Sequence, residues 1–212
     1  MIRIYLIRHG ETVYNAQGRI QGQRDIELTQ LGRSQAKAAA LRLSSEPITA
    51  VYSSDLRRAS DTAQAIARYH GLPVQERPEL RERGLGVLEG LTMPEVESRF
   101  PSDAHPWRLD KAAAPPDGET ADDVVRRCGS FSQRVLSEHG GSGGIVVVGH
   151  FGSVRGVVKA LCPDLPDDRL RFSNASISVL EVGEICTAVL LDDTSHLEQA
   201  QVTINEADSI AG

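Results

Sequence analysis

Short aliphatic runs alternate with longer amphipathic or alanine-rich segments along most of the chain. Short runs bounded by turn residues are typical of buried strands, and longer segments with a helical period are typical of helices. The predicted strands are residues 2–8, 50–53, 74–76 and 145–148, and the predicted helices are residues 30–44, 55–70, 120–139 and 153–161. Strands that alternate with helices predict an α/β three-layer sandwich, in which helices flank a mostly parallel central sheet.

Residues with known capping preferences mark the ends of these helices. Thr29 precedes the first helix, and Thr120 precedes the third, where Asp123 completes a pattern like a capping box. Gly71 follows the second helix and would end it in a left-handed conformation, which glycine adopts without strain. Local chemistry therefore supports three of the four long helices.

Loops and a hairpin complete the predicted organisation. Residues 10–27 form a polar loop long enough to be functional, and residues 80–100 read as a loop followed by a short helix. Residues 176–182 and 186–191 read as an antiparallel hairpin. A proline-rich insertion covers residues 101–118. We expect a single domain over residues 1–212, with the insertion lying over one end of the sheet.

The composition argues against several classes of protein. Hydrophobic residues make up 40% of the 212 residues and charged residues 25%, which is ordinary for a globular domain and too apolar for a disordered chain. The net charge of −6 argues against a nucleic-acid partner, because nucleic-acid binders usually carry a basic surface. The longest aliphatic run, Ile145 to Val148, is too short to span a membrane, and the first residues do not resemble a signal peptide.

The three cysteines, Cys128, Cys162 and Cys186, are odd in number and far apart. Their spacing shows no disulfide framework and no CxxC pair for a metal. Thiols that stay reduced are typical of intracellular proteins, so we predict a cytoplasmic protein.

Two predicted strands end in a histidine beside glycine, which places candidate chemistry at one edge of the sheet. The first strand leads into Arg8, His9 and Gly10, and the fourth leads into Gly149 and His150. Ligands of open α/β sheets bind beyond the carboxyl ends of the strands. Two unrelated surface histidines are the alternative, but their shared position at strand ends favours a common site.

The arginines indicate the type of ligand. Histidines that bind a metal often occur in motifs such as HxH or HExxH, which the sequence lacks, and Arg8 would repel a divalent cation. A guanidinium group instead matches a phosphate. Arg57 and Arg58 follow another strand and open a helix, whose N-terminus also favours anions. We expect one of these two arginines to be solvated, and the site to bind an anion without a metal.

A series of motifs spans nearly the whole chain. They are residues 8–12 with Asn15 and residues 18–22, then residues 28–36, 53–59, 80–90, 149–150 and 174–178. In type and order they resemble the motifs of the histidine phosphatase superfamily, also called phosphoglycerate mutase-like, and the segment 80–90 resembles its phosphatase branch. The resemblance implies the same three-layer fold and an enzyme that transfers a phosphoryl group.

The resemblance implies a catalytic role for five matching residues. His9 would attack phosphorus and form a phosphohistidine, which requires a neutral imidazole in line with the leaving oxygen. Glu82 would protonate that oxygen and then activate water. The remaining three, Arg8, Arg58 and His150, would surround the phosphoryl oxygens.

The loop after the first strand supplies further candidates. Asn15, Gln21 and Gly22 would bind the phosphate or the substrate, whereas Glu11 and Glu89 are expected to brace loops. No metal or other cofactor is implied.

One residue departs from the family pattern. Phe151 follows His150, where the family usually has a small residue. A bulky side chain at this position would either narrow the pocket or turn into the core. The substrate can therefore be inferred less safely from other members of the family.

Three functions follow from the resemblance. The leading one is a metal-independent phosphomonoesterase that acts on a small phosphorylated metabolite, and the alternative is a cofactor-dependent phosphoglycerate mutase. A mutase has to hold a second anionic group, yet the insertion supplies only Arg108 and Lys111 against Asp103, Asp110 and Asp117. A non-catalytic regulatory protein would lack a catalytic residue, and none is missing. The expected partner is a small phosphorylated substrate, and an exposed hairpin edge would allow a homodimer.

Overall fold

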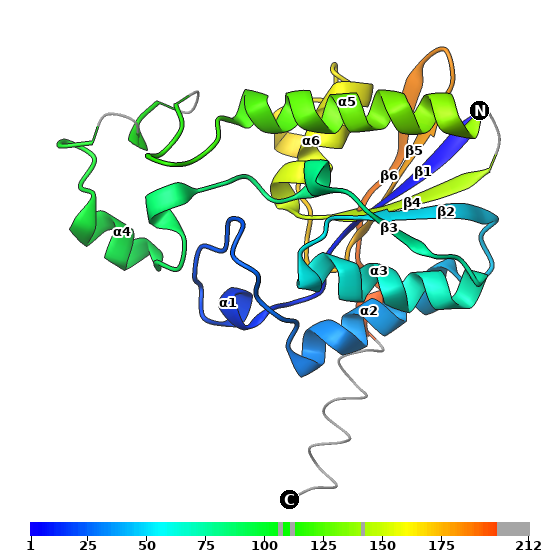
Figure 1. Cartoon of the computed structure of the whole chain (residues 1–212), viewed down its shortest axis with the longest axis horizontal. Coiled ribbons are helices and arrows are strands. Elements are labelled where there is room, and N and C mark those ends of the chain that lie inside the picture. The colour runs from blue at the N-terminus through cyan, green and yellow to red at the C-terminus, as the bar shows by residue number, and fades with distance from the viewer. Residues whose placement is uncertain (106–107, 111–112, 141–142, 199–212) are drawn as a thin grey trace, which may run out of the picture.

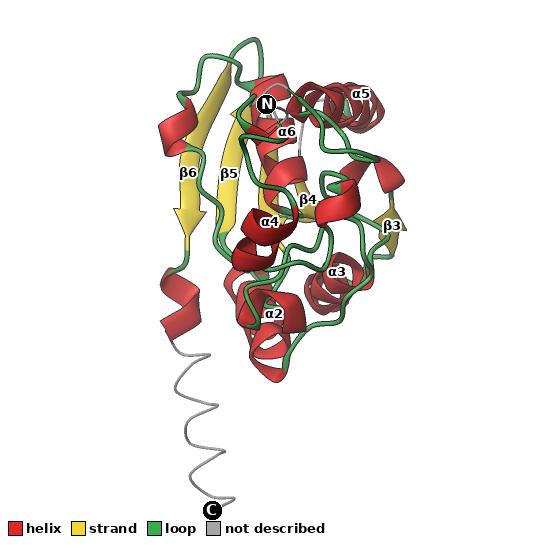
Figure 2. Ribbon diagram, turned by 90° about the vertical axis from the view of Figure 1, so that its left-hand side faces the viewer, coloured by secondary structure: helices red, strands yellow, loops and turns green. Residues whose placement is uncertain are grey.

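A six-stranded sheet forms the centre of the computed structural model, which describes residues 1–105, 108–110, 113–140 and 143–198. The strand order is β3-β2-β4-β1-β5-β6 (Figures 1 and 2). Strands β1 to β4 run parallel to one another, whereas β5 is antiparallel to β1 and the edge strand β6 is antiparallel to β5. The strands are β1 (Ile2–Arg8), β2 (Ile48–Ser53), β3 (Val74–Glu76), β4 (Gly144–Gly149), β5 (Ile177–Val182) and β6 (Cys186–Asp193). The predicted α/β class with a mostly parallel sheet is confirmed.

Two pairs of helices cover the two faces of the sheet. In Figure 1, α5 (Ala121–His139) and α6 (Phe151–Leu161) lie above it, and α2 (Gln30–Leu43) and α3 (Arg57–His70) lie below it. Successive residues of β1 enter opposite cores: Leu6 packs in the cluster with α5 and α6, and Ile7 packs in the cluster with α2 and α3. Because both faces are buried, the parallel strands read as unbroken aliphatic runs.

The capping residues act as the sequence predicts, but two helices begin at other positions. The Thr29 and Thr120 side chains cap α2 and α5, and Gly71 ends α3 with a left-handed conformation. Helix α3 begins at Arg57 and not at residue 55, and Asp55 pairs there with Arg81. Helix α6 begins at Phe151 and not at residue 153. The N-cap residue of α6 is therefore His150, which places that imidazole at a helix N-terminus.

The connecting segments contain shorter helices. The loop over residues 10–27 includes α1 (Val13–Ala16), which was not predicted, and the short helix before residue 101 is α4 (Met93–Arg99). Single 3₁₀ turns cover Pro78–Leu80, Gly86–Leu88, Asp167–Arg169 and Ser195–Leu197. In Figure 1, α4 lies at the left end of the molecule and α1 lies between it and α2, both away from the N-terminus.

The proline-rich insertion returns to the body of the protein at its end. Gly118 forms a β-bridge with Leu85, and the Val87 amide donates to the Pro116 carbonyl at 3.2 Å. Arg108 is bound to Glu97 and to the Phe100 carbonyl. Lys111, named above as a basic residue of the insertion, lies outside the described residues.

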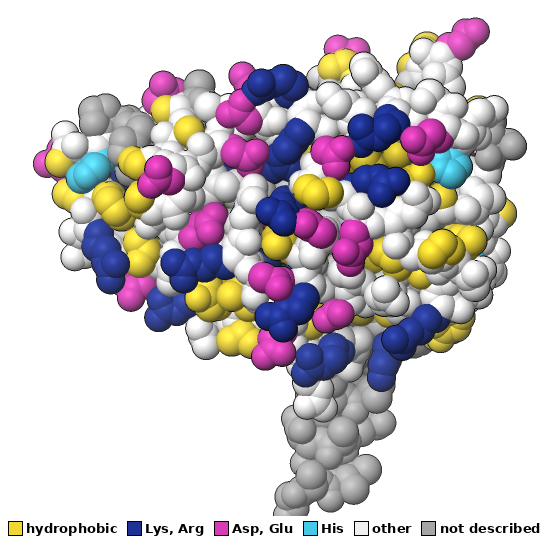
Figure 3. All heavy atoms as spheres, viewed as in Figure 1, with side chains coloured by type: hydrophobic (Ala, Val, Ile, Leu, Met, Phe, Trp, Pro, Cys, Tyr) yellow, Lys and Arg dark blue, Asp and Glu magenta, His cyan; other side chains and the backbone are white. Residues whose placement is uncertain are grey.

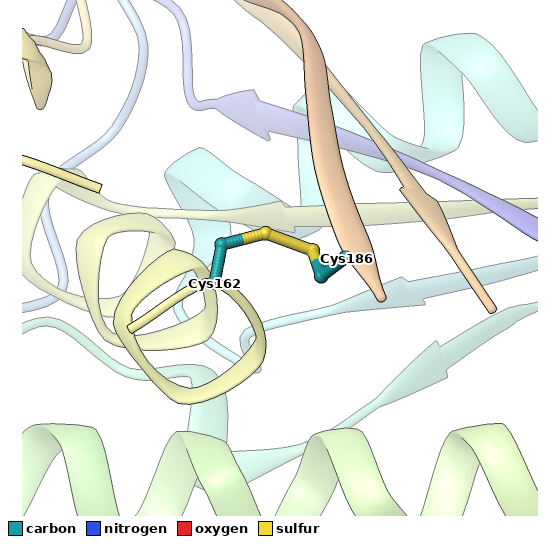
Figure 4. The surroundings of a disulfide bond; sticks show 2 residues. All are labelled: Cys162 and Cys186. Atoms are coloured by element: carbon teal, nitrogen blue, oxygen red, sulfur yellow. A yellow bond between two sulfur atoms is a disulfide. The ribbon is translucent and has the colours of Figure 1, made fainter. Parts of the chain in front are cut away.

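Cys162 and Cys186 form a disulfide, which corrects the prediction from the cysteine spacing. Cys162 follows α6 directly and Cys186 begins β6, and their Cα atoms are 5.4 Å apart (Figure 4). The two residues are 24 positions apart in the sequence. The end of α6 and the β5–β6 hairpin pack in the same core cluster, and spacing alone could not show this. The cysteines therefore no longer argue for a reducing compartment, although Cys128 remains a buried free thiol.

The surface carries both signs of charge. Figure 3 shows Lys and Arg side chains interspersed with Asp and Glu over the face it presents. None of the helices in the described part of the chain is both long enough and apolar enough to cross a membrane.

Candidate active site

His9 lies where β1 ends and is held by the backbone around it. Its amide donates to the Gly149 carbonyl at 2.9 Å, which ties the ends of β1 and β4 together. Its Nδ1 lies 2.7 Å from the Gly10 carbonyl. Because a carbonyl only accepts, Nδ1 carries the proton and Nε2 keeps its lone pair. The ring is 2% exposed. Burial, followed by the charges of Arg58 and Arg8, holds the pKa of His9 well below 6.5, so the ring is neutral.

His150 lies beside His9 with the opposite tautomer. The two ring centroids are 5.0 Å apart. The Arg58 Nε–H donates to His150 Nδ1 at 3.1 Å, so the proton of the neutral ring is on Nε2. Burial and the neighbouring Arg58 charge lower the pKa of His150 well below 6.5. The Nε2 atom is buried without a hydrogen-bond partner among the described residues. It is therefore a donor that an anion in the site would satisfy.

One buried and one half-buried arginine supply the positive charge of the site. Arg58 is fully buried, and its Nη1 and Nη2 groups donate to the carbonyls of Arg24 and Gly22 at 2.6 and 2.8 Å. Burial lowers the pKa of Arg58 to about 10, so it stays charged near neutral pH. Arg8 donates from Nη1 to the Phe172 carbonyl, and its buried Nε has no hydrogen-bond partner among the described residues. Arg57 is the exposed member of its pair and binds Asp25, as expected for one of the two.

Glu82 completes the group of charged side chains. Its Oε1 accepts from the amides of Arg83 and Gly152 at 2.7 and 2.9 Å. Burial raises the pKa of Glu82 above 4.5, and these two amides and the charges of Arg8 and Arg58 only partly offset the effect. The pKa of this carboxyl stays raised even beside the charges of Arg8 and Arg58, so the group keeps its proton to a higher pH than an ordinary glutamate and is suited to act as a general acid.

Gly152 is required where α6 approaches this carboxyl. A Cβ atom at position 152 would lie 2.2 Å from Glu82 Oε1. We expect Gly152→Ala to displace the carboxyl and to lower kcat on alkyl phosphates by about 100-fold, the cost of misplacing a catalytic group by about 1 Å. The matched control is Gly183→Ala, where a Cβ would meet nothing within 4 Å. Steady-state kinetics on both variants provide the test, and equal activity would show that the approach of α6 does not position Glu82.

The three candidates in the loop differ in what they contact. Asn15 Oδ1 accepts from the Thr12 amide and from Asn174 Nδ2, so Asn15 caps α1 and braces the loop. Gln21 Oε1 accepts from the Thr12 hydroxyl at 2.9 Å. Gly22 holds Arg58 through its carbonyl and has a φ of +52°, and a Cβ there would lie 2.0 Å from Glu89. The structure thus gives all three a supporting contact to the site.

Other supporting residues had little or no signal in the sequence. Arg127 on α5 donates to the Glu82, Arg81 and Glu79 carbonyls, which fixes the segment that carries Glu82. Glu119 pairs with Arg127 at 2.9 Å. Both lie outside the motifs quoted above, so only tertiary contacts reveal them. Asn174, which donates to the His9 carbonyl at 3.1 Å, did belong to a quoted motif.

Phe151 does not turn into the core. Its side chain is 42% exposed and packs edge-on against Phe172, with ring centroids 6.0 Å apart. Within the described residues, no group of three or more His, Cys, Asp or Glu side chains is arranged to hold a metal ion. The groups that face one another here are imidazole, guanidinium and carboxyl.

Comparison with known proteins decides the family. A sequence model of the histidine phosphatase superfamily (branch 1) matches residues 4–192. The chain belongs to this superfamily. The resemblance of its motifs is therefore confirmed along almost the whole described chain.

Individual superfamily members are similar over most of their length. The chain is 39% identical over 202 residues to phosphoglycerate mutase-like protein 4 of Arabidopsis thaliana, covering 92% of this chain and 87% of the relative. It is 39% identical over 165 residues to a glucosyl-3-phosphoglycerate phosphatase of Mycolicibacterium vanbaalenii, covering 75% of this chain and 73% of the relative. A solved structure of a mycobacterial glucosyl-3-phosphoglycerate phosphatase with VO3 superimposes with a TM-score of 0.81 at 33% identity, covering 91% of this chain and 99% of that one. The prediction of a histidine phosphatase-type enzyme is confirmed.

Proposed function

We propose that the protein is a metal-independent phosphomonoesterase that hydrolyses a small phosphorylated metabolite through a phosphohistidine at His9. The observation that carries the proposal is the hydrogen bond from His9 Nδ1 to the Gly10 carbonyl, which leaves Nε2 as a nucleophile in a neutral, buried ring. The family and its phosphatase-named members support the reaction type.

The first step transfers the phosphoryl group to His9. Nε2 forms a bond to phosphorus while the ester P–O bond breaks, and the proton of Glu82 goes to the leaving oxygen. The unpartnered Arg8 Nε–H and His150 Nε2–H groups are the donors that would stabilise the charge on the equatorial oxygens. They are already in place before the substrate binds, so little reorganisation is needed.

The second step returns His9 to its starting state. The Glu82 carboxylate takes a proton from water, the hydroxide attacks phosphorus, and the P–N bond breaks. Phosphate leaves, and both Glu82 and His9 regain their initial protonation. One carboxyl therefore acts as acid and then as base, which its raised pKa allows.

The arginines around the site favour hydrolysis over the mutase alternative. A mutase needs free cations to hold a second anionic group. Of the four arginines that could fold over the pocket, Arg19 is bound to Glu95, Arg108 to Glu97, and Arg83 to the carbonyls of Glu119 and Ala113. Among the described residues this leaves the Arg24 guanidinium as the one without a partner. The name of the Arabidopsis relative keeps the mutase as the second candidate.

One experiment separates the two activities. 3-Phosphoglycerate is incubated with the protein, with and without a bisphosphoglycerate primer and with EDTA present, and both phosphate release and 2-isomer formation are followed. We expect phosphate release without a primer and in the presence of EDTA with any accepted substrate. If the 2-isomer formed faster than phosphate was released, and only with the primer, the protein would instead be a mutase.

The pH dependence of kcat/KM provides a further prediction. The reaction needs neutral His9, whose pKa lies well below 6.5, and protonated Glu82, whose pKa lies above 4.5. As the pH falls, activity is lost only well below pH 6.5, where His9 gains a proton. As the pH rises, activity is lost when Glu82 gives up its proton. We expect maximal kcat/KM at weakly acidic pH on an alkyl phosphate. A profile that rises through an ordinary histidine pKa of 6.5 would contradict this assignment.

The remaining sequence predictions stand as proposals. The partner is a small phosphorylated substrate rather than nucleic acid or a membrane, the compartment is cytoplasmic, and the edge strand β6 is the surface on which a homodimer would form. The net charge of −6 supports the first of these. Gel filtration and fractionation test the other two.

A further inference from the structure

A cleft of about 250 Å³ opens beside Glu82, between the N-terminal halves of α5 and α6. Leu85, Val124, Val125 and Phe151 provide most of its wall, and Gly152 forms the wall next to the carboxyl. Phe151 is the residue that departs from the family pattern, and its exposed ring lies at this cleft.

The two cations of the cleft already have partners within the protein. Arg155 pairs with Asp167 at 2.7 Å, and Arg83 donates to the carbonyls of Glu119 and Ala113. Their charged ends are therefore engaged, and their aliphatic stems add to the apolar wall. A substrate with many hydroxyl groups would find few groups here to replace its bonds to water.

The position of Glu82 determines which part of a substrate reaches this cleft. A general acid has to lie within hydrogen-bond distance of the leaving oxygen. Glu82 is the residue that the cleft shares with the proposed catalytic group, so an alcohol whose oxygen is bound at this carboxyl can extend into the cleft. Its volume is just under the range of about 300–1,000 Å³ usual for ligand pockets, so it suits one ring or a short chain.

We infer that this cleft, which we call the leaving-group cleft, selects phosphate monoesters whose alcohol carries an apolar ring or chain, with Phe151 and Val125 as specificity-determining residues. The inference rests on the proposed phosphatase function and deepens it. It concerns only the alcohol, because the phosphate lies among Arg8, Arg58, His9 and His150.

The test compares 3-phenylpropyl phosphate with propyl phosphate. Both have a primary alkyl oxygen as leaving group, so the chemistry is the same and only the apolar ring differs. We expect the wild-type kcat/KM to be about tenfold or more higher for the phenylpropyl ester, the selectivity that a single apolar group gives in a fitting pocket. Phe151→Ala and Val125→Asn should each reduce this ratio towards one. Both variants should keep their activity on propyl phosphate and their inhibition by inorganic phosphate.

Val189→Ala is the control, because Val189 is exposed on the edge strand β6 and is absent from the leaving-group cleft. A wild-type ratio near one, or a ratio that both variants leave unchanged, would overturn the inference while the phosphatase stands. If the wild type hydrolysed neither ester nor any other monoester, both the proposed function and this inference would be wrong.

Discussion

His9→Ala is expected to lower turnover of every accepted phosphomonoester by about 10⁴-fold or more, the loss typical when a covalent nucleophile is removed. No other described side chain at the site offers the same nucleophile, because His150 Nδ1 accepts from Arg58 and its Nε2 carries the proton. The measurements are kcat and trapping of the intermediate with a labelled substrate. The label should be acid-labile and base-stable, and peptide mapping should place it on His9.

The fold of the His9→Ala variant should remain intact, since within the described part of the chain the His9 side chain bonds only to the neighbouring Gly10 carbonyl. Circular dichroism and thermal melting check this. His139→Ala is the matched control, because His139 lies at the C-terminal end of α5 and contacts Tyr52. A label found on a serine or cysteine would show that the mechanism is wrong.

Glu82→Gln is expected to lower kcat on propyl phosphate by about 10²–10⁴-fold, the contribution typical of general acid catalysis. The amide fills the same space but has no acidic proton to give to the leaving oxygen. A p-nitrophenyl ester, whose leaving oxygen needs little protonation, should lose less in the first step. The loss of activity at rising pH should also disappear, because the group that titrates there is gone. Inhibition by inorganic phosphate should change little, because Arg8, Arg58 and His150 remain.

Glu184→Gln, at the exposed turn between β5 and β6, is the control for loss of one negative charge. Steady-state kinetics on the two esters and the pH profile give the readout. If Glu82→Gln matched the wild type on propyl phosphate, the acid would be another carboxyl. Glu11, which accepts from the Thr29 hydroxyl, and Glu89, which accepts from the Gln23 and Leu85 amides, would then be the candidates.

Local patterns were sufficient for the long helices and most strands of the fold, but not for the short helix α1. The strand at Ile2–Arg8 and the capping at Thr29, Gly71 and Thr120 occur as predicted, because burial periodicity and end-capping are decided by neighbouring residues. The start of α6 was missed by two residues, and this small shift matters. The earlier start makes His150 the N-cap residue of α6 and lets the Gly152 amide donate a hydrogen bond to Glu82.

The sequence by itself determined the fold class, the family and the five residues proposed for catalysis, since strand-end positions and ordered motifs are local properties of the chain. The tautomers and protonation of these residues followed only from the tertiary structure. The tautomers of His9 and His150 depend on the Gly10 carbonyl and on Arg58, which is 92 residues from His150. The raised pKa of Glu82 depends on burial by surrounding elements. The Cys162–Cys186 bond and the leaving-group cleft likewise join segments that are distant in sequence. Proton positions, burial and long-range contacts are set by packing in three dimensions, which a local pattern does not record.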